Sequence, residues 1–223
     1  MNIIVIKFGG TSLATVDHFL NASNKIKEIC KKSKVIVVLS AMAGNTNFLA
    51  DLVKKVHDID SPNSDLVLST GEQISIGLMS LILNNKRVKS KTWTAWQIPI
   101  LTNNDYGKAR IKNIPTKNIM DSFKYYDVAI VAGFQGLSEE NTITTLGRGG
   151  SDTTAVAMAA AFKAKQCNIY TDVEGVYSAN PTIVSTAKKI DYLTYEEMLE
   201  MSSLGAKVLQ TRSVELAMKY NVK

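Results

Sequence analysis

Thr144–Ala161, which reads TTLGRGGSDTTAVAMAAA, is the stretch of this 223-residue chain that decides its fold. It opens with β-branched residues, continues through three glycines, and passes from Ser151 into an alanine-rich segment. Serine is a preferred N-cap residue and alanine has the highest helix propensity. The order therefore predicts a strand, a tight turn and a helix capped by Ser151.

The turn of this stretch carries the chemistry of a small-molecule site. Its glycines leave backbone N–H groups open, and the following helix start adds positive potential, which together suit an anion. Arg148 and Asp152 place opposite charges on either side of the turn. An arginine that holds a carboxylate and an aspartate that holds an ammonium describe a receptor for an α-amino acid. The alternative is a helix cap and solvated surface charges.

The rest of the chain alternates buried strands with amphipathic helices. Continuous apolar runs predict strands buried on both faces at Asn2–Phe8, Val35–Leu39, Asp127–Phe134 and Cys167–Thr171. Apolar residues at helical spacing predict helices over 15–32, 48–56, 65–83, 195–203 and 210–220. Residues 86–112 are predicted to form short strands and turns, as a lid or hairpin. This alternation predicts a three-layer α/β/α sandwich around a mainly parallel open sheet, in one domain.

Composition argues against several classes of protein. The 26 basic and 20 acidic residues give a net charge of +6, and the basic residues are scattered rather than interleaved with aromatics, unlike a nucleic-acid surface. A mild positive excess suits polyanionic substrates such as nucleotides. The two cysteines and two histidines form no metal-ligand pattern, and no apolar run is expected to span a membrane. We expect a cytoplasmic protein without nucleic-acid, membrane or resident metal partners.

Polar or glycine-rich segments follow the predicted strands, where ligands of open α/β sheets collect. They are KFGGTS (7–12), SAMAGNT (40–46), GFQG (133–136), GRGGSD (147–152) and TDVEGVY (171–177). The chain has neither a Walker A pattern nor a nucleophile elbow with a histidine partner. Cationic, glycine-rich loops without an evident general base suit phosphoryl transfer to a carboxylate, because that nucleophile is already ionised at neutral pH.

Together with STGEQIS (69–75) and EEMLEMSSLGAKVL (196–209), these segments resemble the aspartokinase signatures, in order and at fitting spacing over essentially the whole chain. The resemblance implies the amino-acid-kinase fold. It also implies transfer of the γ-phosphoryl group of MgATP to the side-chain carboxylate of L-aspartate, with Mg²⁺ carried by the nucleotide. That reaction gives 4-phospho-L-aspartate and opens the lysine/diaminopimelate, threonine and methionine pathways.

The resemblance also implies a role for each matched residue. Two lysines would contact the ATP phosphates from opposite sides, two glycines would donate backbone N–H groups beside the first, and the TDVEGVY loop would line the nucleotide: Lys7, Lys207, Gly9, Gly10, Thr171, Asp172 and Tyr177. The substrate aspartate would be bound by Thr46, Glu72, Arg148, Ser151 and Asp152. Among these, Arg148 would grip a carboxylate and Asp152 would pair with the α-ammonium. The catalytic set is Lys7, Lys207 and Asp152.

The chain departs from the family pattern at three places. Thr182 stands where many relatives have an arginine that helps to hold ATP, and Gln210-Thr211 stands where His-Pro is common. Relatives continue beyond the equivalent of Lys223 through another strand and paired ACT domains. We therefore expect residues 1–223 to be a catalytic domain without its last strand and without regulatory ACT domains. Feedback control by lysine or threonine would then need another chain.

Two alternatives to an aspartokinase remain open. One is another enzyme of the same fold, which phosphorylates acetylglutamate, glutamate or a nucleotide. The other is a non-catalytic or truncated subunit that binds an amino acid or a nucleotide. The sequence also leaves open whether the protein forms a homo-oligomer or works with a separate regulatory chain.

Overall fold

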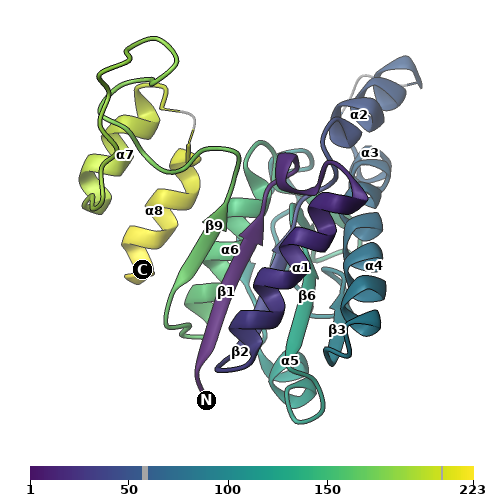
Figure 1. The fold of residues 1–223 in the computed structure, drawn as a ribbon. Helices are drawn as coiled ribbons and strands as arrows, with labels where there is room; N and C mark the ends of the chain where they lie inside the picture. Colours follow the sequence, from purple (N-terminus) through teal and green to yellow (C-terminus); the bar gives the residue numbers. More distant parts are fainter. Residues whose placement is uncertain (57–59, 207) are drawn as a thin grey trace.

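Five parallel strands form the central layer of the computed structural model, which describes residues 1–56, 60–206 and 208–223 (Figure 1). Their order in the sheet is β3-β6-β2-β1-β9. The strands are β1 (Ile3–Phe8), β2 (Lys34–Leu39), β3 (Ser90–Trp93), β6 (Val128–Ala132) and β9 (Cys167–Tyr170). The four runs expected to form strands are confirmed: β1, β2 and β6 are buried between two layers of helices, whereas β9 is half-buried at the edge of the sheet.

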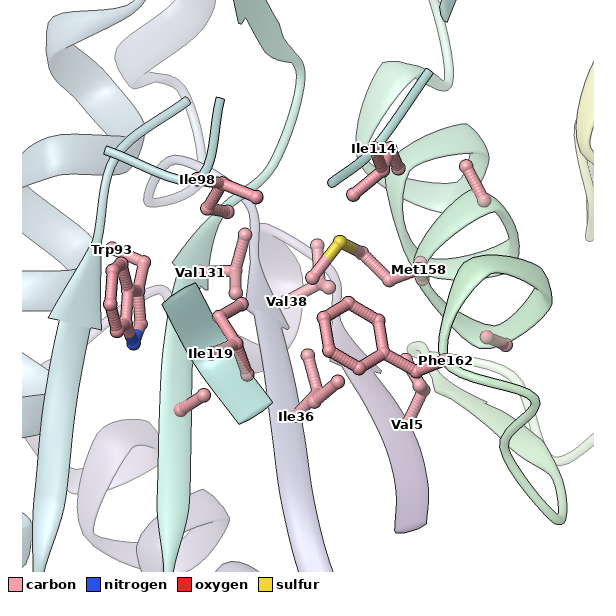
Figure 2. Packing of buried hydrophobic residues seen from close by; sticks show 14 of the residues in the cluster. Val5, Ile36, Val38, Trp93, Ile98, Ile114, Ile119, Val131, Met158 and Phe162 are labelled. Carbon is pink, nitrogen blue, oxygen red and sulfur yellow. The ribbon is translucent and has the colours of Figure 1, made fainter. Parts of the chain in front are cut away.

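The two faces of this sheet bury separate hydrophobic cores, since successive strand residues point to opposite faces. On one face, α1 (Val16–Cys30) and α4 (Thr70–Asn85) pack on residues such as Ile6 and Val37. On the other face, α5 (Lys117–Ser122) and α6 (Gly150–Ala161) cover Val5 and Ile36, with Met158 among the packed side chains (Figure 2). The predicted α/β/α sandwich with a parallel sheet is therefore confirmed.

A second, smaller sheet stands beside the sandwich and was not predicted. Its order is β5-β4-β7-β8, with the strands β4 (Leu101–Thr102), β5 (Ile111–Asn113), β7 (Gln135–Leu137) and β8 (Ile143–Thr145). The strand predicted before the GRGGSD turn is β8, and it belongs to this second sheet. The short strands and turns expected over residues 86–112 are confirmed: β3 joins the edge of the main sheet beside β6, and β4 pairs antiparallel with β5 in the second sheet.

The helices differ from the expected pattern in two respects: α5 was not predicted, and one expected helix is divided. The helix expected over 65–83 is two helices, α3 (Pro62–Leu68) and α4, which meet at Ser69. By length and mean hydropathy (1.5) alone, Pro62–Asn85 is apolar enough to cross a membrane, which was not recognised from the sequence. In the fold, however, α4 buries Ile76 and Met79 in the core of the sandwich, as the core helix of a globular domain does.

The remaining helices are α2 (Asn45–Val56), the 3-10 turn η1 (Thr11–Leu13), α7 (Tyr195–Ser203) and α8 (Thr211–Tyr220). Figure 1 shows α7 and α8 beyond the β9 edge of the sheet, with α8 nearer to α6. A capping box fixes the start of α7, where Thr194 and Glu197 exchange side-chain and backbone hydrogen bonds.

Candidate functional site

A cavity of about 390 Å³ gathers the residues expected to bind the amino acid together with Lys7, which was expected at the ATP phosphates. They come from β1, α2, α4, the turn before α6, and α6 itself: Lys7, Thr46, Glu72, Arg148, Ser151 and Asp152. Ser40, Asn47 and Phe134 share the lining and were not singled out from the sequence. Lys7, Ser40 and Phe134 lie at or just beyond the carboxyl ends of β1, β2 and β6, where ligands of such sheets bind.

A buried ion pair lies at the floor of this cavity. Lys7 Nζ is 2.6 Å from Asp152 Oδ1, and the two side chains are only 10% and 11% exposed. Asp152 lies in the first turn of α6, where the helix dipole favours a negative charge. The expected partner of Asp152 was the substrate ammonium, but the structure gives one of its oxygens to Lys7. Asp152 therefore fixes the position of the Lys7 ammonium group.

Gly9 and Gly10, which follow β1, were both expected to donate backbone N–H groups to the ATP phosphates, but their surroundings differ. The N–H of Gly9 donates to Tyr170 O at 3.0 Å and extends the pairing of β1 with β9. Because this N–H already has a partner, it is not available to a phosphate, and the expected phosphate contact of Gly9 is wrong. A Cβ on Gly9 would lie 3.3 Å from Lys7 Nζ, so this glycine leaves room for the ammonium group. The role of Gly10 as a phosphate donor stays a prediction.

Glu72 is a buried carboxylate with one uncommitted oxygen. The residue is 3% exposed, and its Oε1 accepts from Ala41 N–H at 2.9 Å. Its Oε2 has no hydrogen-bond partner among the residues that the structure describes. Burial raises the pKa of Glu72 from 4.5 to about 8, although the Ala41 hydrogen bond opposes this rise. An exposed helical glutamate, the alternative interpretation, is excluded.

The turn that carries Arg148 is built by left-handed glycines. Gly147 and Gly149 have φ of 74° and 69°, a conformation in which a side chain is strained. Gly149 is the N-cap of α6 and no side chain caps it, so the prediction that Ser151 caps the helix is wrong. Ser151 lies inside the first turn instead and packs against Gly133 after β6. Arg148 is exposed and lines the cavity.

A second cavity, of about 730 Å³, is lined by the segment expected to bind the nucleotide. Thr171, Asp172 and Tyr177 all line it, and Thr171 Oγ1 donates to Asp172 Oδ1 at 2.9 Å. The segment begins where β9 ends, next to the end of β1, because Phe8 pairs with Tyr170. Lys207 lies outside the described residues, so its role stays a prediction.

Thr182, one of the departures from the family pattern, directly follows the wall of this second cavity. Asn180 and Pro181 line the cavity, and the Asn180 side chain accepts hydrogen bonds from the backbone N–H and the hydroxyl of Thr182 at 3.0 and 2.7 Å. Thr182 therefore closes a local turn, in place of the long cation expected there in many relatives.

Cys167 of β9 lies near the Lys7–Asp152 pair. Burial, and to a smaller extent the charge of Asp152, raise the pKa of its thiol to about 12, although Lys7 opposes this rise. A thiol with this pKa stays protonated at neutral pH, so Cys167 adds no charge beside the ion pair.

Comparison with known proteins agrees with this geometry. The profile described as "Amino acid kinase family" matches residues 2–223, and the chain belongs to that family. The aspartate kinase of Pseudomonas fluorescens (strain SBW25) is 50% identical over 226 residues, which cover 100% of this chain and 55% of that protein. An aspartokinase of Geobacillus stearothermophilus is 49% identical, with 100% and 55% covered. The chain thus spans about half the length of these curated relatives.

Solved structures agree in fold. The aspartokinase III of E. coli in complex with aspartate and ADP superimposes with a TM-score of 0.88 at 29% identity, over 99% of this chain and 60% of that one. The aspartate kinase from Synechocystis gives a TM-score of 0.88 at 40% identity, over 99% and 36%. The expected amino-acid-kinase fold is confirmed.

Proposed function

We propose that the chain is the catalytic domain of an aspartate kinase, which transfers the γ-phosphoryl group of ATP to the side-chain carboxylate of L-aspartate. One observation carries the proposal: the Lys7–Asp152 pair, Glu72 and Arg148 line a single cavity. The similarity to proteins named aspartate kinases over the whole of this chain supports it, as does the similarity to a structure that contains aspartate and ADP.

The charges of the cavity are complementary to an acidic amino acid. Arg148 offers a planar fork that can hold one substrate carboxylate bidentately. The unpartnered Oε2 of Glu72 is an acceptor for the α-ammonium group, whose arrival favours the ionised form of Glu72. Lys7 would then lie near the other carboxylate of the substrate, the one that Arg148 does not hold. An N-acetylated amine cannot supply that cation, so the site favours a free amino acid.

The nucleotide fits the second cavity, which adjoins the end of β1. Thr171, Asp172 and Tyr177 would hold the nucleotide there, and Lys7 would stabilise negative charge at the phosphates. Bound MgATP supplies the transferable phosphoryl group, and its Mg²⁺ neutralises part of the phosphate charge. The substrate carboxylate is ionised at neutral pH, so the protein has only to orient the two groups and neutralise their charge.

The pathway and the compartment belong to the same proposal. The product would feed the lysine/diaminopimelate, threonine and methionine pathways. A cytoplasmic location is supported by the use of ATP and by Cys30 and Cys167, which are both free thiols.

A coupled assay of ADP release tests the proposal. With MgATP, we expect turnover with L-aspartate and far less with L-glutamate, N-acetyl-L-glutamate or UMP. Arg148→Ala should lose the response to aspartate, whereas Glu215→Gln, at an exposed position of α8, should keep it. Preference for another acceptor would identify a different enzyme of the family. Binding of both ligands without transfer would identify a non-catalytic subunit.

A further inference from the structure

Asp65 of α3 is a fully buried carboxylate that does not line the substrate cavity. Its Oδ2 accepts from Thr145 N–H at 2.7 Å, and its Oδ1 accepts from Thr145 Oγ1 at 2.7 Å. The N–H of Gly107 donates to both oxygens, at 3.0 and 3.2 Å. One carboxylate therefore joins the last residue of β8 to the segment that precedes β5.

Arg212 of α8 joins the same two segments from another side. Its Nη1 donates to Leu146 O at 2.9 Å and makes a longer contact with Ala109 O at 3.5 Å. Between these two bridges, Ala109 N–H donates directly to Thr145 O at 2.8 Å. Two charged side chains from helices far apart in the sequence, α3 and α8, thus hold the consecutive residues Thr145 and Leu146 at the end of β8.

These held peptide units come directly before the turn that carries Arg148. Gly147 follows Leu146, and a Cβ on Gly147 would lie 2.9 Å from Gly107 O, so the turn also packs on the held segment. Because glycines flank Arg148 on both sides, the turn has few side chains of its own to fix its course. The position of Arg148 therefore depends on the position at which the end of β8 is held.

We propose that Asp65 and Arg212 are positioning residues, which hold the turn of Arg148 where it can grip the substrate carboxylate. This inference rests on the proposed function, and it assigns a task to two charged residues that do not line the substrate cavity. A misplaced guanidinium loses its bidentate contact, so the affinity for the amino acid should suffer more than that for the nucleotide.

Matched pairs of variants separate hydrogen bonding from packing. Asp65→Leu keeps the approximate shape but leaves the N–H groups of Thr145 and Gly107 without an acceptor. Asp65→Asn retains one oxygen for these groups, and its amide can donate to the Thr145 hydroxyl, which accepts as well as donates. Likewise, Arg212→Met removes the donor to Leu146 O, whereas Arg212→Lys retains one.

Steady-state kinetics with L-aspartate and ATP test the proposal. We expect Asp65→Leu and Arg212→Met to raise the aspartate KM about tenfold, which corresponds to the loss of one hydrogen bond to a charged group. The ATP KM should stay within about twofold of wild type. Asp65→Asn and Arg212→Lys should stay near wild type, as should Lys219→Met at an exposed position of α8. A lower turnover number with both KM values unchanged, or an equal rise in both, would overturn the inference.

Trypsin cleavage after Arg148 gives a second readout that does not need activity. Mass spectrometry should show faster cleavage there in Asp65→Leu and Arg212→Met, relative to cleavage after the exposed Lys124. If the wild-type chain shows no aspartate-dependent turnover, the proposed function fails and this ratio alone decides the inference. If Asp65→Leu does not fold, Arg212→Met decides it. An unchanged ratio in a folded variant contradicts the positioning role.

Discussion

Replacing Glu72 with glutamine should change the dependence of stability on pH. Burial raises the pKa of Glu72 from 4.5 to about 8, so the folded protein keeps a proton that the unfolded chain has already lost over this interval. Below pH 4.5 both states hold the proton. As pH rises from there, the free energy of unfolding of the wild type falls relative to that of Glu72→Gln, because glutamine has no proton to lose.

The size of this effect follows from the two pKa values. Each pH unit between them costs about 1.4 kcal/mol, and the whole interval gives at most roughly 5 kcal/mol by pH 8. Glutamine can keep the hydrogen bond to Ala41 N–H, since that bond needs only Oε1. The variant should therefore be similar to the wild type near pH 5 and increasingly more stable toward pH 8.

Urea unfolding at half-unit steps from pH 5 to pH 8 measures the difference directly. Groups other than Glu72 cancel when the variant is subtracted from the wild type. Glu215→Gln, at an exposed position, is the matched control and should give a flat difference. Parallel curves for the wild type and Glu72→Gln would refute the conclusion that Glu72 is buried with an uncommitted oxygen. In kinetic assays, Glu72→Gln should also raise the aspartate KM, because the acceptor for the α-ammonium loses its charge.

Three further substitutions test the site. Lys7→Met should lower kcat by about a hundredfold or more and destabilise the fold by roughly 3–5 kcal/mol, because Asp152 stays buried without its partner. Adding Asp152→Asn should restore the urea midpoint without restoring turnover, and an unaltered kcat in Lys7→Met would contradict its role. Arg148→Lys should raise the aspartate KM about tenfold in initial-rate assays, since a lysine cannot bind bidentately, and an unchanged KM would exclude that contact. Gly149→Ala should lower stability by about 1–2 kcal/mol in thermal unfolding, because its φ is 69° and its Cβ would overlap Gln210; an unchanged midpoint would exclude this strain.

The sequence predicted the parts of the fold that local pattern determines. The strands β1, β2 and β6 were recognisable because a strand covered on both faces is almost entirely apolar. The second sheet was not recognisable, since its strands have two or three residues and no sustained alternation. The break at Ser69 was also missed, because apolar spacing continues through α3 into α4.

For the site, motifs predicted which residues meet but not how they are paired. Lys7 and Asp152 were both expected at the site, yet their direct contact depends on how α6 packs over β1. The burial of Glu72 and the bridge from Asp65 to Thr145 depend on the packing of α4 and α3, which no local pattern encodes. Signals of this kind are tertiary and become visible only in coordinates.

Trapping of the phosphorylated product is the most direct test of the central claim, that the cavity around Lys7, Glu72 and Arg148 presents an amino-acid carboxylate to ATP. The chain is incubated with MgATP, L-aspartate and hydroxylamine, which converts an acyl phosphate to a stable hydroxamate. We predict aspartyl hydroxamate in amounts that match the ADP released, and none with succinate, which lacks the amine. ADP release without hydroxamate, or equal hydroxamate from succinate, would contradict the claim.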